Sequence, residues 1–150
     1  MSTMHKVDLP LDICIMIADY LPKYVLHDWI DVNKLDWDEL SANPFAIDLL
    51  KENPDKIDWS WLSINPLAVD LLQSNPDKID WVNLSINRAA VSILRNNVDR
   101  IYWDSLSSNP LAIDLLKENL DKIDWHVLSG NNAIFKPVRD QAILNILYAL

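Results

Sequence analysis

The chain is poor in glycine and cysteine: its 150 residues include only Gly130 and Cys14 of these two types. Scarce glycine disfavours tight β-hairpins, whose turns need residues with positive φ, whereas helices tolerate it well. A single cysteine excludes an intrachain disulfide and fits a reducing compartment. We therefore expect a helical protein in an intracellular setting.

Basic residues and long apolar runs are also scarce. Thirteen Lys and Arg stand against 22 Asp and Glu, giving a formal net charge of −9 and an acidic pI near 4.5. This balance disfavours general nucleic-acid binding, which needs clustered Lys and Arg. The early apolar run 13–18 is too short to span a bilayer, and the first ten residues lack the apolar core of a signal peptide. We expect neither a nucleic-acid nor a membrane partner.

A tandem repeat of 22 residues organises the rest of the chain. Tryptophan recurs in steps of 22 residues, at Trp37, Trp59, Trp81, Trp103 and Trp125. A strict period of this length indicates supersecondary units that stack on their neighbours. We divide the chain into an N-terminal segment, 1–35, five tandem units over 36–131 of which the last is partial, and a C-terminal capping segment, 132–150.

The clearest unit runs from Asp58 to Ile79 and predicts two short helices. Asp58 is placed to cap a helix over 59–63, and Asn65 to cap a second helix that begins with proline. Asn75 occupies the position of a left-handed C-cap, and the proline after it prevents continuation. Helices this short are marginal alone, so stacking must supply their stability.

The predicted fold class is therefore all-α, an α-solenoid of either handedness built from two-helix repeats with capping helices at both ends. A leucine-rich repeat has a similar period, but the alternation at Trp61 has no counterpart in the other units, and Asp before each tryptophan disfavours a strand. The five repeat tryptophans are the predicted structural core. Replacing one by alanine would then cost about 3–5 kcal/mol. A cost below about 1 kcal/mol would mark an exposed binding stripe instead.

Three polar columns could carry chemistry, and each has a structural explanation. Stacked helices lie about 8–10 Å apart, whereas Ca²⁺ ligands lie about 2.3–2.6 Å from the ion, so we expect the aspartate column to cap helices. The basic column adjoins aspartates and predicts a solvated mixed-charge ridge. The serine column is expected to bond backbone in the turns. These columns are Asp36, Asp58, Asp80 and Asp124; Lys34, Lys56, Lys78, Arg100 and Lys122; and Ser41, Ser63, Ser85, Ser107 and Ser129.

No constellation indicates catalysis. The histidines, His5, His27 and His126, are scattered and lack metal-ligand spacing. A chain with one glycine has no glycine-rich phosphate loop. We therefore predict no catalytic, cofactor-binding or metal-binding residues, no cofactor, and a protein that is not an enzyme.

The segment from Asp8 to Pro22 predicts an amphipathic helix that Pro22 ends. It resembles the opening helix of an F-box, the short helical motif that docks onto the Skp-type adaptor of cullin–RING ubiquitin ligases. The later Val32, Lys34 and Trp37 resemble the second F-box signature, with one extra residue between the last two. The alternative is a terminal cap for the repeats. The resemblance assigns adaptor binding to Leu9, Pro10, Ile13, Ile17, Tyr20 and Leu21.

The repeats, from Leu35 to Asn131, resemble the short Asp-Trp/Asn-Pro repeats (DWxxLSxNPxAIxLLxxNPDKI) of proteins from giant, mimivirus-like DNA viruses. The resemblance implies a viral protein in the host cytoplasm, the viral factory or the virion. With the F-box-like start, it implies a protein–protein interaction module that recruits an unknown target to a host cullin–RING ligase. The alternative is a structural or scaffold protein of the virus with no ubiquitin-ligase role.

One unit, 80–101, departs from the pattern. Arg88 and Val98 replace prolines, Ser92 replaces aspartate, and the next unit begins with Tyr102 instead of aspartate. Such a break indicates either drift or a binding surface. Its candidate partner-binding residues are Arg88, Arg95, Arg100 and Tyr102. A last helix over 138–148 would cap the array or pair two arrays, which leaves the oligomeric state open.

Overall fold

The structure, a computed structural model, describes residues 23–136. Within this range every regular element is an α-helix or a 3₁₀-helix and none is a strand, which confirms the all-α prediction and removes the leucine-rich-repeat alternative there. None of the described helices is long and apolar enough to cross a membrane. The F-box-like segment up to residue 22 and the helix predicted over 138–148 lie outside the described residues.

Each of the first four units contributes a helix that begins at its tryptophan and a second helix, and the fifth contributes a first helix only within the described residues. Short 3₁₀ turns lie between or beside these helices. The first helices are α2 (Trp37–Ala42), α4 (Trp59–Ile64), α6 (Trp81–Ile86), α8 (Trp103–Ser107) and α10 (Trp125–Leu128). The second helices are α3 (Ile47–Glu52), α5 (Val69–Gln73), α7 (Val91–Arg95) and α9 (Ile113–Lys117). The 3₁₀ turns are η1 (Val32–Lys34), η2 (Pro44–Ala46), η3 (Pro54–Lys56), η4 (Pro76–Lys78), η5 (Arg88–Ala90), η6 (Val98–Arg100), η7 (Leu120–Lys122) and η8 (Asn132–Ile134).

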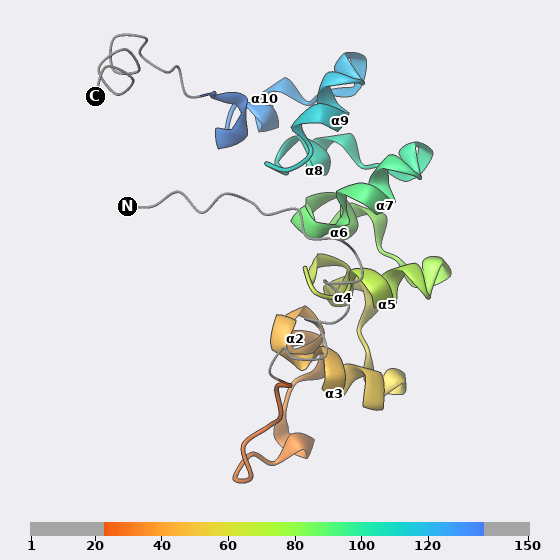
Figure 1. Cartoon of the computed structure of the whole chain (residues 1–150), viewed down its shortest axis with the longest axis vertical. Coiled ribbons are helices and arrows are strands. Elements are labelled where there is room, and N and C mark those ends of the chain that lie inside the picture. Colours follow the sequence, from red (N-terminus) through yellow and green to blue (C-terminus); the bar gives the residue numbers. More distant parts are fainter. Residues whose placement is uncertain (1–22, 137–150) are drawn as a thin grey trace, which may run out of the picture.

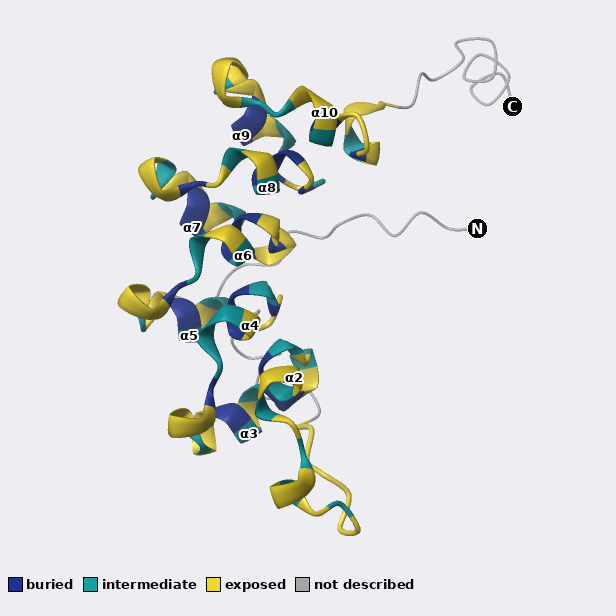
Figure 2. Cartoon of the chain, turned by 180° about the vertical axis from the view of Figure 1, so that it is seen from behind, coloured by how far each residue is buried: buried dark blue, intermediate teal, exposed yellow. Residues whose placement is uncertain are grey.

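The units lie one above another in chain order (Figure 1). Helices α2, α4, α6, α8 and α10 each pack against the next in that series. The second helices form a column beside them, and η3, η4, η6 and η7 form the outer corners. Figure 2 shows the buried residues on the strip between the two helix columns and exposed residues at the corners.

Repeated aliphatic side chains fill this strip as one hydrophobic cluster. Each unit contributes a leucine from each helix, an alanine from the turn between them, and an isoleucine from the returning segment. The fully buried leucines are Leu50, Leu62, Leu72, Leu84, Leu94, Leu106, Leu115 and Leu116. Trp37, Trp59, Trp81 and Trp103 are only partly buried and pack against the cluster from its edge.

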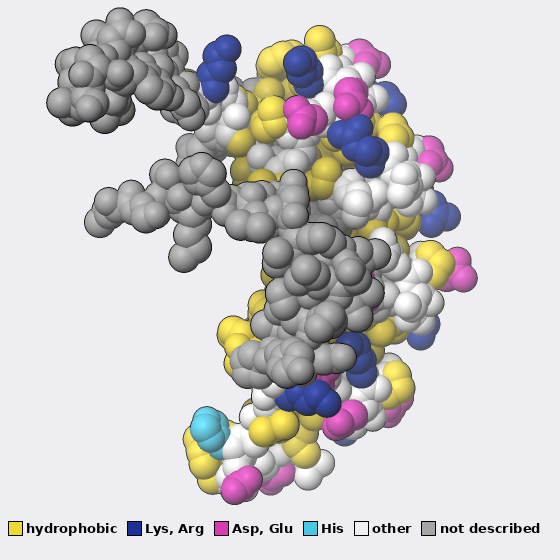
Figure 3. All heavy atoms as spheres, in the orientation of Figure 1, with side chains coloured by type: hydrophobic (Ala, Val, Ile, Leu, Met, Phe, Trp, Pro, Cys, Tyr) yellow, Lys and Arg dark blue, Asp and Glu magenta, His cyan; other side chains and the backbone are white. Residues whose placement is uncertain are grey.

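The basic column covers these tryptophans. Lys56, Lys78 and Lys122 each place Nζ 4.5–4.9 Å from the ring centroid of the tryptophan in the preceding unit, and the Arg100 guanidinium lies 5.1 Å from Trp81. Such cation–π contacts stabilise the pair while the cation stays hydrated. The basic column therefore also shields aromatic surface, in addition to forming the mixed-charge ridge along the corners in Figure 3.

The core prediction is wrong for Trp125, which is 62% exposed. In the other units the basic residue stands 19 positions after the tryptophan. The equivalent position for Trp125 is Leu144, which carries no charge. The last tryptophan therefore has no cationic partner of this kind.

The aspartate column caps helices, as predicted. The carboxylate oxygens of Asp36, Asp58, Asp80 and Asp124 accept hydrogen bonds from backbone N–H groups of the first turn at 2.8–3.1 Å. These bonds satisfy donors that a helix start leaves unpaired. Tyr102, which replaces the aspartate before α8, makes no such side-chain bond.

The predicted left-handed C-cap at Asn75 is wrong. Its φ is −135° and its ψ is 60°, and no described residue, glycine included, has a positive φ. Instead Asn75 Nδ2 donates to the Leu71 carbonyl at 2.9 Å. Because the side chain satisfies this last-turn carbonyl, the backbone needs no left-handed residue.

A second set of asparagines links consecutive units through the interior. Asn65 Oδ1 accepts from Leu67 N at 3.0 Å within the turn between α4 and α5. The sequence predicts Asn65 as the N-cap of a helix that begins at Pro66, and this is wrong, because α5 begins at Val69 with Ala68 as its N-cap. Asn65 Nδ2 also donates to two carbonyls of the preceding unit, Ser41 O at 2.9 Å and Asn43 O at 3.0 Å. Asn87 and Asn109 repeat all three bonds at 3.0–3.2 Å. We call Asn65, Asn87 and Asn109, all almost fully buried, the asparagine ladder.

The serine column adds a further link between units. Ser63 Oγ donates to the Trp59 carbonyl at 2.7 Å, a local bond of the predicted kind. The same oxygen accepts from the backbone N–H of Asp80 in the next unit at 3.0 Å. Every buried side-chain nitrogen and oxygen among the described residues has a hydrogen-bond partner. The interfaces between units are therefore apolar and also fully hydrogen-bonded.

Replacing Asn87 by alanine should destabilise the fold. The change leaves the carbonyls of Ser63 and Asn65 without this donor and Ala89 N without its acceptor, and buried unsatisfied groups cost about 1–3 kcal/mol each. We expect a loss of about 3 kcal/mol in the free energy of unfolding, measured by urea denaturation. Asn96→Ala, at an exposed position, is the control and should cost less than about 0.5 kcal/mol. Equal losses in the two variants would contradict the ladder.

Two tryptophan replacements separate the core edge from the surface. Trp81→Ala should cost about 3 kcal/mol, because the indole packs on the core beneath Arg100. Trp125→Ala should cost less than about 1 kcal/mol, because most of its side chain is already in water. Urea denaturation of the two variants side by side measures the difference, and equal costs would overturn this assignment.

Candidate partner-binding surfaces

The F-box-like residues, Leu9, Pro10, Ile13, Ile17, Tyr20 and Leu21, all lie outside the described residues. Part of the second F-box signature is described. Val32 and Lys34 lie in the 3₁₀ turn η1, whose N-cap Asp31 accepts from Asn33 N at 3.1 Å. Trp37 begins α2 and packs on the core of the first repeat unit.

The structure brings together only part of the second predicted surface. Arg100 and Tyr102 line a shallow depression of about 580 Å³ together with Trp81. Arg95 does not line it: its Nη1 lies 2.6 Å from Glu118 Oε2 of the next unit, an exposed ion pair. Arg88, exposed at the start of η5, does not line it either. The irregular unit therefore presents separate basic residues instead of one basic patch.

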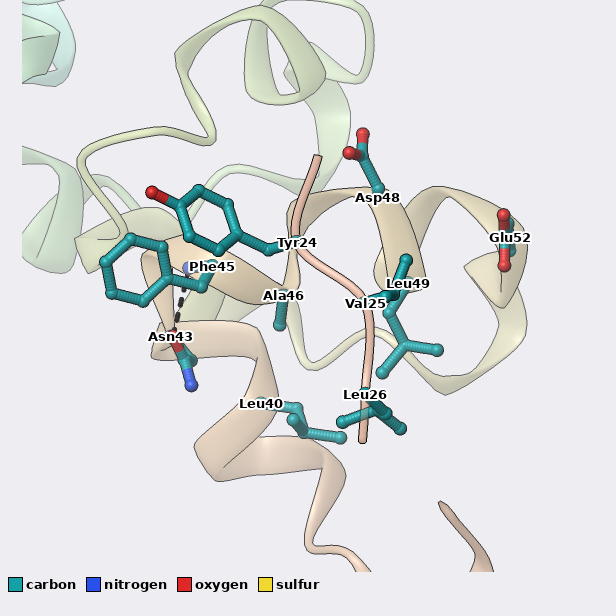
Figure 4. Close-up of a pocket in the computed structure, with 10 residues that line it drawn as sticks. All are labelled: Tyr24, Val25, Leu26, Leu40, Asn43, Phe45, Ala46, Asp48, Leu49 and Glu52. Carbon is teal, nitrogen blue, oxygen red and sulfur yellow. Dashed lines mark hydrogen bonds between the residues drawn. The ribbon is translucent and has the colours of Figure 1, made fainter. Parts of the chain in front are cut away.

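An apolar pocket of about 330 Å³ lies at the N-terminal end of the array. The segment Tyr24–Leu26 crosses the first unit, and Figure 4 shows Leu26 near Leu40, with Tyr24 over Phe45. The ring centroids of Tyr24 and Phe45 are 4.4 Å apart. Asp48 and Glu52 border the same pocket. The repeat pattern did not predict this site, although the apolar run at 24–26 was a signal for it.

Exposed apolar side chains recur at one position of successive units. Phe45 is 57% exposed, Leu67 60% and Leu111 65%, and the equivalent residue of the third unit, Ala89, is also exposed. Each lies two residues after an asparagine, in the turn between the two helices of its unit. We call Phe45, Leu67, Ala89 and Leu111 the apolar column.

Carboxylates accompany the apolar column. Three positions after each large member of the apolar column, in the first turn of α3, α5 and α9, lie Asp48, Asp70 and Asp114, all exposed. Asp48 and Phe45 line the same pocket. We call Asp48, Asp70 and Asp114 the acidic column. The third unit has Ser92 at this position, so it lacks both the large apolar residue and the acid.

The described residues offer no cluster of three or more His, Cys, Asp or Glu side chains able to hold a metal ion. Among the three histidines, His27 stacks loosely on Trp29, with ring centroids 6.5 Å apart. The exposed arrangements that recur from unit to unit are the apolar column and the acidic column.

Comparison with known protein families, curated proteins and solved structures gave no match to this chain.

Proposed function

We propose that this chain is a non-enzymatic protein–protein interaction module, an α-solenoid of 22-residue two-helix units closed by capping helices at both ends. The observation that carries the proposal is the apolar column. Large apolar side chains more than half exposed stand at the same place in the first, second and fourth units. Exposed apolar surface in a regular arrangement is typical of a binding face.

Folding alone gives no reason for this column. The core is already formed by the buried leucines, alanines and isoleucines of each unit. The turns that carry the column are held by the asparagine ladder, whose bonds use the asparagine side chain and backbone only. A polar residue at Leu67 or Leu111 would serve the fold equally well, so their apolar character supports a role in binding.

In its sharper form, the proposal assigns the F-box-like start to the Skp-type adaptor of a host cullin–RING ligase and the array to an unknown target in the host cytoplasm. The support is the sequence resemblance of residues 9–22. Tyr24, which follows this segment in the chain, contacts Phe45 of the first unit. An adaptor-binding helix beside a target-binding array would bring the target near the ligase.

The adaptor role is tested by co-purification of the full chain with a Skp-type adaptor. We expect binding by the unaltered chain and its loss in the double variant Leu9→Ala, Pro10→Ala, because these residues would contact the adaptor. Leu120→Ala, an exposed change in η7, is the control and should retain binding. Unchanged binding by the double variant, or no binding by any form of the chain, would contradict the adaptor role and favour a structural protein of the virus.

A further inference from the structure

The apolar column has a fixed spacing. Asn43 O and Asn65 Nδ2 lie 3.0 Å apart, as do Asn65 O and Asn87 Nδ2, so the turns that carry the column stack directly on one another. Packed helices of this kind lie about 8–10 Å apart. Neighbouring members of the column are therefore about this distance apart.

The upper end of this spacing is close to the repeat along one face of an α-helix. A helix rises 1.5 Å per residue, so residues seven apart lie about 10.5 Å apart on nearly the same face. A β-strand returns to the same face about every 6.6–6.8 Å, which does not match the units. A helix lying along the column would place one apolar residue against each unit.

The negative charges beside the apolar column determine which charge the flanking residues of a partner should carry. Asp48, Asp70 and Asp114 form a negative row along one side. Lys51 Nζ lies 3.9 Å from Asp48, but both side chains stay 55% exposed, so this carboxylate can still meet another cation. A partner helix with Lys or Arg on that side gains attraction, whereas Asp or Glu there is repelled.

The first unit already holds a segment of matching chemistry. Tyr24 and Val25, which follow Lys23, lie on the pocket that Phe45, Asp48 and Glu52 line. Apolar residues that directly follow a lysine in the chain therefore pack beside the first member of the apolar column. Leu67 and Leu111 are more exposed than Phe45.

We propose that the apolar column binds an amphipathic α-helix of a partner protein, with large apolar residues seven positions apart and Lys or Arg on the flank that faces the acidic column. This inference rests on the proposed protein-binding function and gives that function a partner chemistry. In the third unit Ala89 and Ser92 replace the apolar residue and the acid, and Arg88 adds a positive charge. An acidic residue of the partner helix opposite Arg88 sets its register.

Binding of synthetic helical peptides to the full chain, followed by fluorescence anisotropy, tests the inference. One peptide carries leucine at every seventh position with lysine beside it, and its twin has glutamate in place of lysine. We expect the lysine peptide to bind at least tenfold more tightly, with an affinity that falls as salt is raised. The double variant Asp70→Asn, Asp114→Asn should bind the lysine peptide more weakly, and its affinity should depend less on salt.

Matched leucine variants locate the site. Leu111→Ser should lower the affinity for the lysine peptide about tenfold. Leu120→Ser, which changes a leucine of similar exposure (59%) in η7 at the outer corner, should leave it unchanged. Circular dichroism checks that both variants remain folded. Equal effects of the two variants, equal affinity for the two peptides, or no binding of either peptide would overturn the inference.

A second copy of this chain is the competing occupant. Light scattering at two concentrations measures self-association, and a dimer that Leu67→Ser abolishes would overturn the inference by assigning the column to a partner copy. The adaptor experiment is independent of the peptide experiment, because it depends on Leu9 and Pro10. If neither peptide binds but the adaptor still does, the amphipathic-helix partner is rejected and the adaptor role is kept. If the glutamate peptide binds tightly and Leu111→Ser weakens its binding, the basic flank is rejected and the protein-binding function is kept.

Discussion

The rest of the structure depends on one buried side-chain amide in each interior interface. Asn65, Asn87 and Asn109 use Oδ1 within their own turn and Nδ2 on two carbonyls of the preceding unit. A buried amide that loses these partners pays the full cost of desolvation. An insertion or deletion within a unit would move the amide away from its carbonyls. This requirement accounts for a period of 22 residues that holds from Trp37 to Trp125 without a break.

The same amide sets the register of the surface. Because each turn is tied to the turn before it, the residue two positions after the asparagine appears at the same place in every unit. The third unit shows that the two roles are separate: Asn87 keeps its bonds, while Arg88 and Ala89 replace proline and a large apolar residue. The fold constrains the asparagine, and the two positions that follow it can change without loss of its bonds.

Local features were predictable from the sequence, and contacts between units were not. The aspartate caps follow from residues two or three apart, so Asp58 and Asp80 identify helix starts by themselves. The partners of the asparagine ladder lie 22 and 24 residues away, and the sequence predicts only a local helix cap at Asn65, which is wrong. At Asn75 a side-chain bond replaces the predicted left-handed turn. The repeat pattern predicts buried tryptophans, because the lysine and arginine side chains that cover them come from the next unit and are not apparent within one unit. Tyr24 lies outside the repeats, so the repeat pattern does not predict the pocket there.

Hydrogen exchange of the asparagine side-chain amides, followed by NMR on the ¹⁵N-labelled chain, tests the ladder most directly. If Asn65, Asn87 and Asn109 bridge the units, their Nδ2 protons exchange only when the array opens, and far more slowly than those of the exposed Asn33 and Asn96. Exchange of the ladder amides at the rate of the exposed ones would show that the units are not held together by these bonds, and would contradict the account.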